Sequence, residues 1–497
     1  MGSIPRERRF KADTVCIIGA GPSGIAAAKY LAAEKTFSRI VVYEQRSKTG
    51  GLWNYIPCDS ETAKVPIPQT NPHAGHDEPI WETNGGSGTL ASDTQEPQFM
   101  TPVYERLETN IPAPKALMGF SDLEWEQGCQ LFPKHQEVLA YIDRYAQDVS
   151  HLISFKTQVL DVRLCNDQKW TVKTRPIDRS MDGKVTEEVF DAVICANGHY
   201  DVPYIPSVSG IEAWNEAFPG VISHSKFYRR PEQYAGKKVI VVGNSASGID
   251  IGAQVETVCK VPLIMSQKSE SYLNVEGAKS TKVERPEIVE YLVKNRSVRF
   301  ADGTIEADID AILYCTGYFY SYPFLDSLDP PVVKTGERVV NTYEHVFYRP
   351  QPTLSFLGLN QKVIPFPMAE VQAAVVARVL SGRLPLPLEH EMQAWEDAVV
   401  KEMGDGRNFH VLKFPRDADH INMLHDWARS ADRESSGVRK TPPRWHEKQY
   451  WIRERFPNIK KAFNDRGEER SQVQSLEELG YDFAKWREEK EKGEHTL

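Results

Sequence analysis

The chain has 497 residues, of which 26% are charged, and its formal net charge at pH 7 is −9. This acidic balance argues against nucleic-acid binding, because phosphate backbones select basic surfaces. Seven widely spaced cysteines without a CxxC pair argue against a disulfide scaffold or a zinc site. With no signal peptide and no apolar run near the ~18 residues of a membrane span, we expect a cytoplasmic protein without a stable membrane anchor.

The first predicted elements are a strand, a turn and a helix at residues 15–31, VCIIGAGPSGIAAAKYL. In this pattern the first glycine permits a tight turn, the second lets the backbone approach a pyrophosphate, and the third lets the helix pack on the strand. The helix N-terminus adds amide donors and a dipole. The next strand, RIVVYEQ, reaches Glu44, 20 residues after Gly24, where a carboxylate can accept hydrogen bonds from ribose hydroxyls. The segment predicts a dinucleotide with a free ribose diol.

A second strand, turn and helix follow at residues 239–250, VIVVGNSASGID, with Ser245 in place of the middle glycine. Lys268 lies 20 residues after Gly248, at the same offset as Glu44 but with the opposite charge. A carboxylate repels a 2′-phosphate, whereas an ammonium attracts it. We call each strand, turn and helix of this kind a cradle, and we interpret the second cradle as an NADP site. The alternative for Lys268 is a solvated lysine at the end of a strand.

The two motifs belong to a longer internal repeat. Residues 191–198, DAVICANG, and 310–317, DAILYCTG, each read as an acid, an apolar strand and a terminal glycine. Before the second of these segments, Asp302-Gly303 predicts a hairpin turn. Each half of the repeat therefore resembles a complete nucleotide-binding unit, with the second inserted in the first.

Two dinucleotides in one chain indicate a flavoprotein that takes hydride from NADPH onto FAD. A disulfide reductase would need a CxxC or CxxxxC pair, which does not occur, so the electrons go to oxygen or to an external carrier. We expect an α/β fold of two Rossmann-like dinucleotide-binding domains, with the NADP domain inserted in the FAD domain. The expected boundaries are 1–205 and 330–430 for the FAD domain, 206–329 for the NADP domain, and 431–497 for a helical C-terminal extension.

Residues 218–228, FPGVISHSKFY, match the pattern FxGxxxHxxxY at Phe218, Gly220, His224 and Tyr228. The chain thereby resembles the flavin-containing monooxygenases, whose fingerprint this is. The related Baeyer–Villiger monooxygenases carry tryptophan where this chain has Tyr228. Further segments of the resemblance, which covers roughly residues 14–375, are TGGLWNY at 49–55, YERLETNIPAPKALMGFSD at 104–122, CTGY at 315–318 and FLGLNQKVIPFPMAEVQA at 356–373.

The resemblance implies a set of site residues. Asn110 matches the family's active-site asparagine and is the expected catalytic residue, with a structural turn residue as the alternative. His224 is interpreted as a joint between the domains, with proton transfer as the alternative, and no metal site is expected. The expected cofactor-binding residues are Gly19, Gly21, Pro22, Ser23, Gly24, Glu44, Gln45, Gly51, Leu52, Trp53, Thr109, Asn110, Val159, Gln372, Asn244, Ser245, Ala246, Ser247, Gly248, Ser266, Lys268 and Thr316.

The resemblance also implies a reaction. NADPH reduces FAD, oxygen adds at flavin C4a, and the resulting hydroperoxide transfers one oxygen atom to a soft sulfur or nitrogen atom of a small-molecule sulfide, thiol or amine. Two alternatives stay open: a Baeyer–Villiger enzyme that acts on ketones, and an NADPH oxidase or redox-responsive nucleotide-binding flavoprotein. A homodimer also stays open, as do the roles of the polar loop at 59–101 and of the C-terminal extension.

Overall fold

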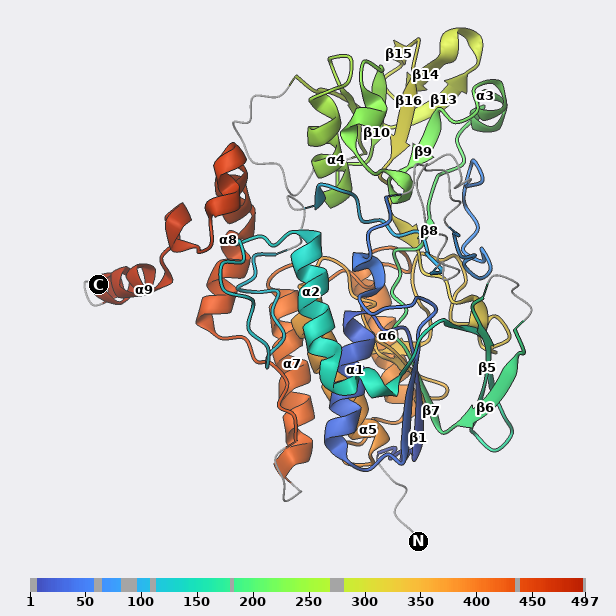
Figure 1. Cartoon of the computed structure of the whole chain (residues 1–497), viewed down its shortest axis with the longest axis vertical. Coiled ribbons are helices and arrows are strands. Elements are labelled where there is room, and N and C mark those ends of the chain that lie inside the picture. The colour runs from blue at the N-terminus through green and yellow to red at the C-terminus, as the bar shows by residue number, and fades with distance from the viewer. Residues whose placement is uncertain are drawn as a thin grey trace, which may run out of the picture.

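The chain forms a mixed sheet with a parallel core and a smaller parallel sheet, both with helices packed on them, so the predicted α/β class is confirmed in this computed structural model (Figure 1). Among the described residues, no helix is long and apolar enough to cross a membrane. The structure describes residues 7–57, 65–81, 96–107, 113–178, 183–268, 281–433 and 439–494.

The larger sheet has seven strands in the order β18-β19-β20-β7-β1-β2-β3. Its interior strand β1 is parallel to both neighbours and alternates between two cores: Val15 and Ile17 face one apolar cluster, whereas Cys16 and Ile18 face another. Burial on both faces explains why the strand is apolar throughout its centre. The strands are β1 (Thr14–Ile18), β2 (Arg39–Tyr43), β3 (Ile153–Ser154), β7 (Ala192–Cys195), β18 (Thr342–Tyr343), β19 (Phe347–Tyr348) and β20 (Leu354–Phe356).

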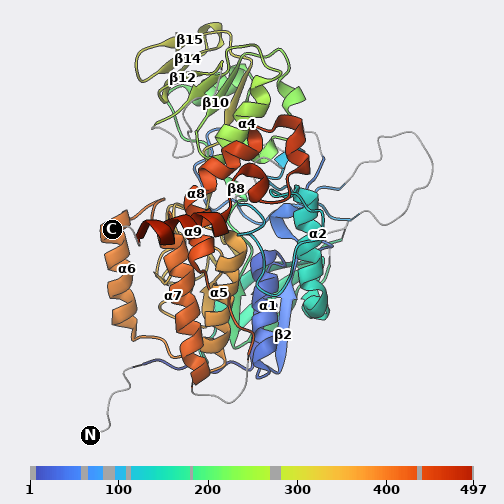
Figure 2. The ribbon, with the colours of Figure 1, turned by 90° about the vertical axis from the view of Figure 1, so that its left-hand side faces the viewer.

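Helices cover the larger sheet, and the central one, α5, packs between α1 and α7 (Figures 1 and 2). Every residue of α5 after Pro365 is buried. Small residues such as Ala373 and Ala377 let the neighbouring backbones approach closely, which suits a helix enclosed on several sides. The helices are α1 (Pro22–Glu34), α2 (His135–Ala146), α5 (Pro365–Leu380), α6 (Glu389–Met403) and α7 (Arg416–Ser430).

The smaller sheet has five parallel strands in the order β12-β11-β10-β16-β9. Strand β10 repeats the alternation of β1, because Val239 and Val241 share a cluster with helix α4 whereas Ile240 faces the opposite core. The elements are β9 (Ile222–His224), β10 (Val239–Val242), β11 (Ile264–Ser266), β12 (Val283–Arg285), β16 (Ala311–Tyr314), α3 (Ile211–Ala217) and α4 (Ala246–Glu256).

Three short antiparallel sheets complete the fold. The hairpin predicted at Asp302-Gly303 is confirmed, since Gly303 has a φ of +83° and the Thr304 amide donates to Asp302 Oδ1 over 2.9 Å. The strands are β4 (Thr157–Leu164), β5 (Trp170–Pro176) and β6 (Thr186–Phe190); β13 (Ile288–Leu292), β14 (Ser297–Phe300) and β15 (Ile305–Glu306); and β8 (Val202–Pro203) with β17 (Tyr318–Phe319).

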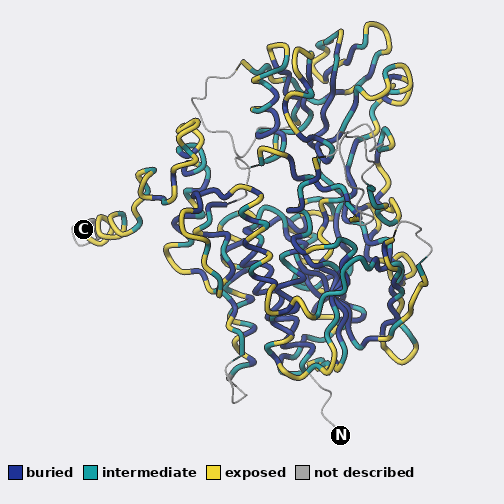
Figure 3. The backbone as a smooth tube through the Cα atoms, viewed as in Figure 1, coloured by how far each residue is buried: buried dark blue, intermediate teal, exposed yellow. Residues whose placement is uncertain are grey.

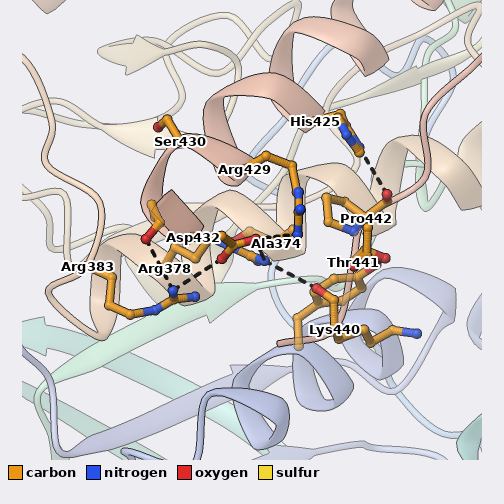
Figure 4. Close-up of polar contacts among 12 residues, drawn as sticks. Ala374, Arg378, Arg383, His425, Arg429, Ser430, Asp432, Lys440, Thr441 and Pro442 are labelled. Carbon is orange, nitrogen blue, oxygen red and sulfur yellow. Dashed lines mark hydrogen bonds and ion pairs between the residues drawn. The ribbon is translucent and has the colours of Figure 1, made fainter. Parts of the chain in front are cut away.

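The C-terminal part of the chain is tied to α5 by buried ion pairs (Figure 4). Arg378 donates to Asp432 over 3.4 Å and to the Lys440 carbonyl over 3.2 Å, and Arg383 donates to Asp432 over 3.2 Å. Buried charges are tolerated when such partners satisfy them. Helices α8 (Glu447–Asn464) and α9 (Phe483–Glu494) follow, and Figure 3 shows that α9 is mostly exposed.

Candidate functional site

The turn after β1 has the backbone that a pyrophosphate cradle requires. Gly19 has a φ of +99°, and its amide donates to the Tyr43 carbonyl over 2.8 Å. A Cβ on Gly24 would lie 1.9 Å from the Gly19 carbonyl oxygen, so only glycine fits there. A Cβ on Gly21 would meet Gly51 Cα at 3.6 Å, an ordinary contact. Packing of the chain alone therefore does not require glycine at position 21, at the start of α1, whereas the predicted approach of a pyrophosphate would require it.

The turn after β10 repeats this geometry. Gly243 has a φ of +107°, and its amide donates to the Ser266 carbonyl over 2.8 Å. A Cβ on Gly248 would lie 2.0 Å from the Gly243 carbonyl oxygen. Gly21 is the N-cap residue of α1, and Ser245 is the equivalent N-cap residue of α4. Neither of these two described helices is capped by a side-chain hydrogen bond. The two cradles are therefore built on one backbone plan.

The residues at the ends of the following strands differ in charge. The buried Glu44 carboxylate accepts hydrogen bonds of 2.8 Å from the amides of Ala20 and Arg46, which hold it beside the first cradle. The Lys268 side chain is 81% exposed, and its ammonium lies 2.8 Å from the Glu287 carboxylate, which raises the pKa of Lys268. An exposed pair of this kind is worth less than about 1 kcal/mol, so an incoming phosphate can compete with Glu287 for Lys268.

The loop TGGLWNY packs against the first cradle. The Gly50 amide donates to the Ala20 carbonyl over 3.1 Å, and a Cβ on Gly51 would lie 3.1 Å from Gly21 Cα. Trp53 is buried, with its ring edge-on to Phe366 at 6.5 Å between centroids. The loop is therefore fixed beside Gly21, as expected for residues that contact a flavin.

Gln372, which is buried in α5, organises a second loop beside the same cradle. Its Oε1 accepts from the Gly358 amide over 2.9 Å, and its Nε2 donates to Asn360 Oδ1 over 2.7 Å. A Cβ on Gly358 would lie 3.2 Å from Ser23 Oγ, so the loop lies against the cradle. Within the described part of the chain, the buried Asn360 Nδ2 has no hydrogen-bond partner. An unpaired buried donor fits a polar cofactor edge.

Asn360 was not among the predicted site residues. The only sequence signal for it is its place in FLGLNQ, between Gly358 and Gln361. Its unpaired amide becomes apparent only when the loop after β20 is packed against Ser23.

Other predicted residues lie around the two cradles. Gln45 Oε1 accepts from Gln158 over 3.4 Å, which brings β4 and its buried Val159 to the end of β2. Asn244 donates to Gln267 over 2.9 Å, beside Lys268. Thr109 and the proposed catalytic Asn110 lie outside the described residues. Two further predicted residues donate to backbone carbonyls: Ser266 Oγ to Pro286, over 3.0 Å, and Thr316 Oγ1 to Tyr204.

His224 of the fingerprint connects segments of the chain that run between the larger and the smaller sheet. Its Nδ1 accepts from the Lys226 amide over 3.1 Å, and its Nε2 donates to the Gly317 carbonyl over 3.0 Å. The same carbonyl accepts from the Tyr204 amide over 3.0 Å, where β8 pairs with β17. Burial lowers the pKa of His224 to about 3. A neutral, fully bonded imidazole acts here as a joint and not as a proton carrier near neutral pH.

Comparisons with known proteins agree with this arrangement. Residues 85–281 and 278–431 match the family described as Flavin-binding monooxygenase-like, and residues 17–83 match the NAD(P)-binding Rossmann-like domain. The chain belongs to the flavin-binding monooxygenase family. It is therefore an oxidoreductase of the monooxygenase class, and its cofactors are FAD and NADP(H).

Individual relatives and one solved structure show how similar the chain is to particular proteins. The chain is 35% identical over 394 residues to Flavin-containing monooxygenase FMO GS-OX-like 7 of Arabidopsis thaliana, covering 76% of this chain and 75% of the relative. Identity to FMO GS-OX5 of the same plant is 33% over 401 residues, or 78% of each chain. The structure of S-allyl-L-cysteine S-oxygenase from Allium sativum is 28% identical, covers 98% of this chain and 100% of its own, and has a TM-score of 0.72.

The fold class, the monooxygenase class and the two cofactors predicted from the sequence are thereby confirmed. The domain boundaries and the individual cofactor contacts stay predictions.

Proposed function

We propose that this chain uses NADPH, FAD and O2 to transfer one oxygen atom to a soft sulfur or nitrogen atom of a small molecule. The observation that carries the proposal is the pair of matching cradles with opposite charges beside them. Glu44 suits the free ribose of FAD, and Lys268 suits the 2′-phosphate that distinguishes NADPH from NADH. One chain then holds both the hydride donor and the group that receives the hydride.

Each part of the proposed reaction has its residues. FAD, when bound, supplies the electron transfer and the activation of oxygen. The first cradle and Glu44 would hold its pyrophosphate and ribose, while Trp53 and Phe366 would exclude water from that side. The start of α4 and Lys268 would hold NADP, and Asn110 would act at the reacting edge of the flavin.

The preference for sulfur or nitrogen rests on the relatives and on the fingerprint. The Allium structure, which covers nearly the whole chain, is that of an S-oxygenase. Tyr228 stands where the Baeyer–Villiger relatives have tryptophan. The structure of cyclohexanone monooxygenase is only 13% identical, so its likeness concerns the fold alone. We therefore favour a sulfide, thiol or amine over a ketone as the substrate.

Product analysis tests this proposal. The purified, FAD-loaded protein would be given NADPH and, in separate reactions, methyl p-tolyl sulfide, N,N-dimethylbenzylamine or cyclohexanone. We expect the sulfoxide or the N-oxide to form and no lactone. Lactone as the main product would establish the Baeyer–Villiger alternative, and hydrogen peroxide with none of these products would favour the oxidase alternative.

A further inference from the structure

Helix α4, whose N-terminus is the proposed NADP cradle, carries a buried carboxylate. Asp250 is only 8% exposed and stands in the second turn of the helix. Its Oδ2 accepts hydrogen bonds from the Tyr104 hydroxyl and, over 2.9 Å, from Gln254 Nε2. A buried carboxylate is stable only with such donors around it, so this arrangement is a specific one.

These bonds link α4 to two other segments. Gln254 Nε2 also donates to the Arg106 carbonyl over 3.1 Å, and Gln254 Oε1 accepts from the Tyr228 hydroxyl over 3.1 Å. The rings of Tyr104 and Tyr228 meet edge-on at 5.2 Å between centroids. Asp250 and Gln254 therefore connect the helix with the end of the fingerprint and with the segment that leads, in sequence, to Asn110.

The same segment is fixed from its other side by Arg229, the residue after the fingerprint. This buried guanidinium donates to the carbonyls of Val103, over 2.9 Å, and Thr101, over 3.0 Å. Residues 101–106 are thus held between Arg229 and helix α4. Because Arg229 fixes residues 101–106, a shift of α4 would break the hydrogen bonds between α4 and these residues.

We propose that Asp250 is a positioning residue for NADP(H): its bonds to Tyr104 and Gln254 fix α4 against residues 101–106. The inference rests on the proposed function, because the position of α4 matters to the reaction only if its N-terminus binds NADP. The carboxylate itself touches neither cofactor in this account. Asp250 would affect the binding of NADP(H) by fixing the position of helix α4.

The test compares Asp250→Ala with Asp250→Asn. We expect Asp250→Ala to raise the KM for NADPH about tenfold, because both donors lose their acceptor, with a smaller change in kcat. FAD content should stay at the wild-type level, since the first cradle is built on other elements. Asp250→Asn keeps an acceptor oxygen for the two donors and should recover most of the KM. An unchanged KM in a flavin-loaded Asp250→Ala protein would overturn the inference.

Gln254→Leu serves if Asp250→Ala does not fold, because it removes the bonds to Asp250, Arg106 and Tyr228 without leaving a cavity. It should also raise the KM for NADPH with FAD retained, and a wild-type KM would overturn the inference. Direct titration of each protein with NADPH separates the two proposals. Failure of the wild-type protein to bind NADPH contradicts the proposed function, whereas equal binding by wild-type and Asp250→Ala contradicts only the positioning role.

Discussion

At the scale of single residues, Gly21 and Gly24 stand three positions apart but are required for different reasons. A Cβ on Gly24 would overlap the Gly19 carbonyl oxygen at 1.9 Å, whereas a Cβ on Gly21 would meet Gly51 at 3.6 Å. Gly21 also has a φ of −77° and a ψ of −177°, which other residues adopt readily. Packing of the chain alone explains Gly24, while Gly21 is best explained by a ligand.

The two glycines give a matched pair of variants. Gly21→Val should fold and lose FAD, because the branched side chain would fill the space proposed for the pyrophosphate. Gly24→Ala should instead lower the free energy of unfolding, since its Cβ clashes with the backbone. Flavin absorbance per protein and thermal unfolding measure the two effects. A fully flavinylated Gly21→Val protein would show that FAD binds elsewhere.

We expect Lys268 to determine the preference of the protein for NADPH over NADH. Lys268→Glu should lower the preference for NADPH over NADH about tenfold to a hundredfold, because a charge-assisted contact is worth ~1.5–3 kcal/mol. The ratio of kcat/KM values for the two cofactors measures this preference. Lys294→Glu makes the same charge change on the exposed turn between β13 and β14 and serves as the control. An unchanged ratio in Lys268→Glu would leave Lys268 as a solvated lysine paired with Glu287.

Asn110 is expected to act after the flavin has been reduced. Its side-chain amide offers two donors and an acceptor, enough to hold NADP⁺ or an ordered water at the reacting edge of the flavin. Asn110→Ser should therefore keep FAD and continue to oxidise NADPH, while hydrogen peroxide replaces the oxygenated product. Product and peroxide formed per NADPH are the quantities to measure. A wild-type product yield would favour the structural turn interpretation.

At the scale of secondary-structure elements, the strand, turn and helix units could be predicted because their signals are local. The spacing from Gly19 to Gly24, and again from Gly243 to Gly248, fixes the turn regardless of the rest of the chain. The role of Asn360 could not be predicted in this way. Its environment depends on Gln372, which lies one helix further along, and on Ser23, which lies more than 300 residues earlier.

His224, the last residue of β9, leads to a prediction about how the free energy of unfolding depends on pH. The folded pKa of His224, about 3, lies below its ordinary value of 6.5. Above pH 6.5 the imidazole is neutral in both states, so the stability contribution is complete there. As the pH falls from 6.5 toward 3, the unfolded chain takes up a proton that the folded chain excludes. The free energy of unfolding should then fall by about 1.4 kcal/mol per pH unit for this group.

Urea unfolding at pH 6.0 and pH 5.0 tests this contribution. His224→Gln keeps an amide donor for the Gly317 carbonyl but has no group that titrates in this range. The loss of stability between the two pH values should be smaller in the variant by about 1 kcal/mol. An equal loss in both proteins would mean that His224 is already protonated in the folded state.

At the scale of the whole molecule, the repeat in the sequence predicts the α/β class and the presence of two cradles, but not how the later helices pack. An amphipathic helix shows which of its faces is buried, and not against which partner. Contacts such as Arg378 with Asp432, or Tyr104 with Asp250, join segments that are far apart in the sequence. The attachment of residues 101–106 to the helix of the proposed NADP cradle therefore emerges only from the folded chain.

The central proposal is that the whole chain transfers one atom of O2 to a small molecule. Turnover of methyl p-tolyl sulfide with NADPH under ¹⁸O2 tests that claim most directly, with mass spectrometry of the product and a parallel assay of NADPH. We predict one ¹⁸O atom in each sulfoxide molecule and one sulfoxide for each NADPH consumed. Sulfoxide without the label, or NADPH oxidation matched entirely by hydrogen peroxide, would contradict the account.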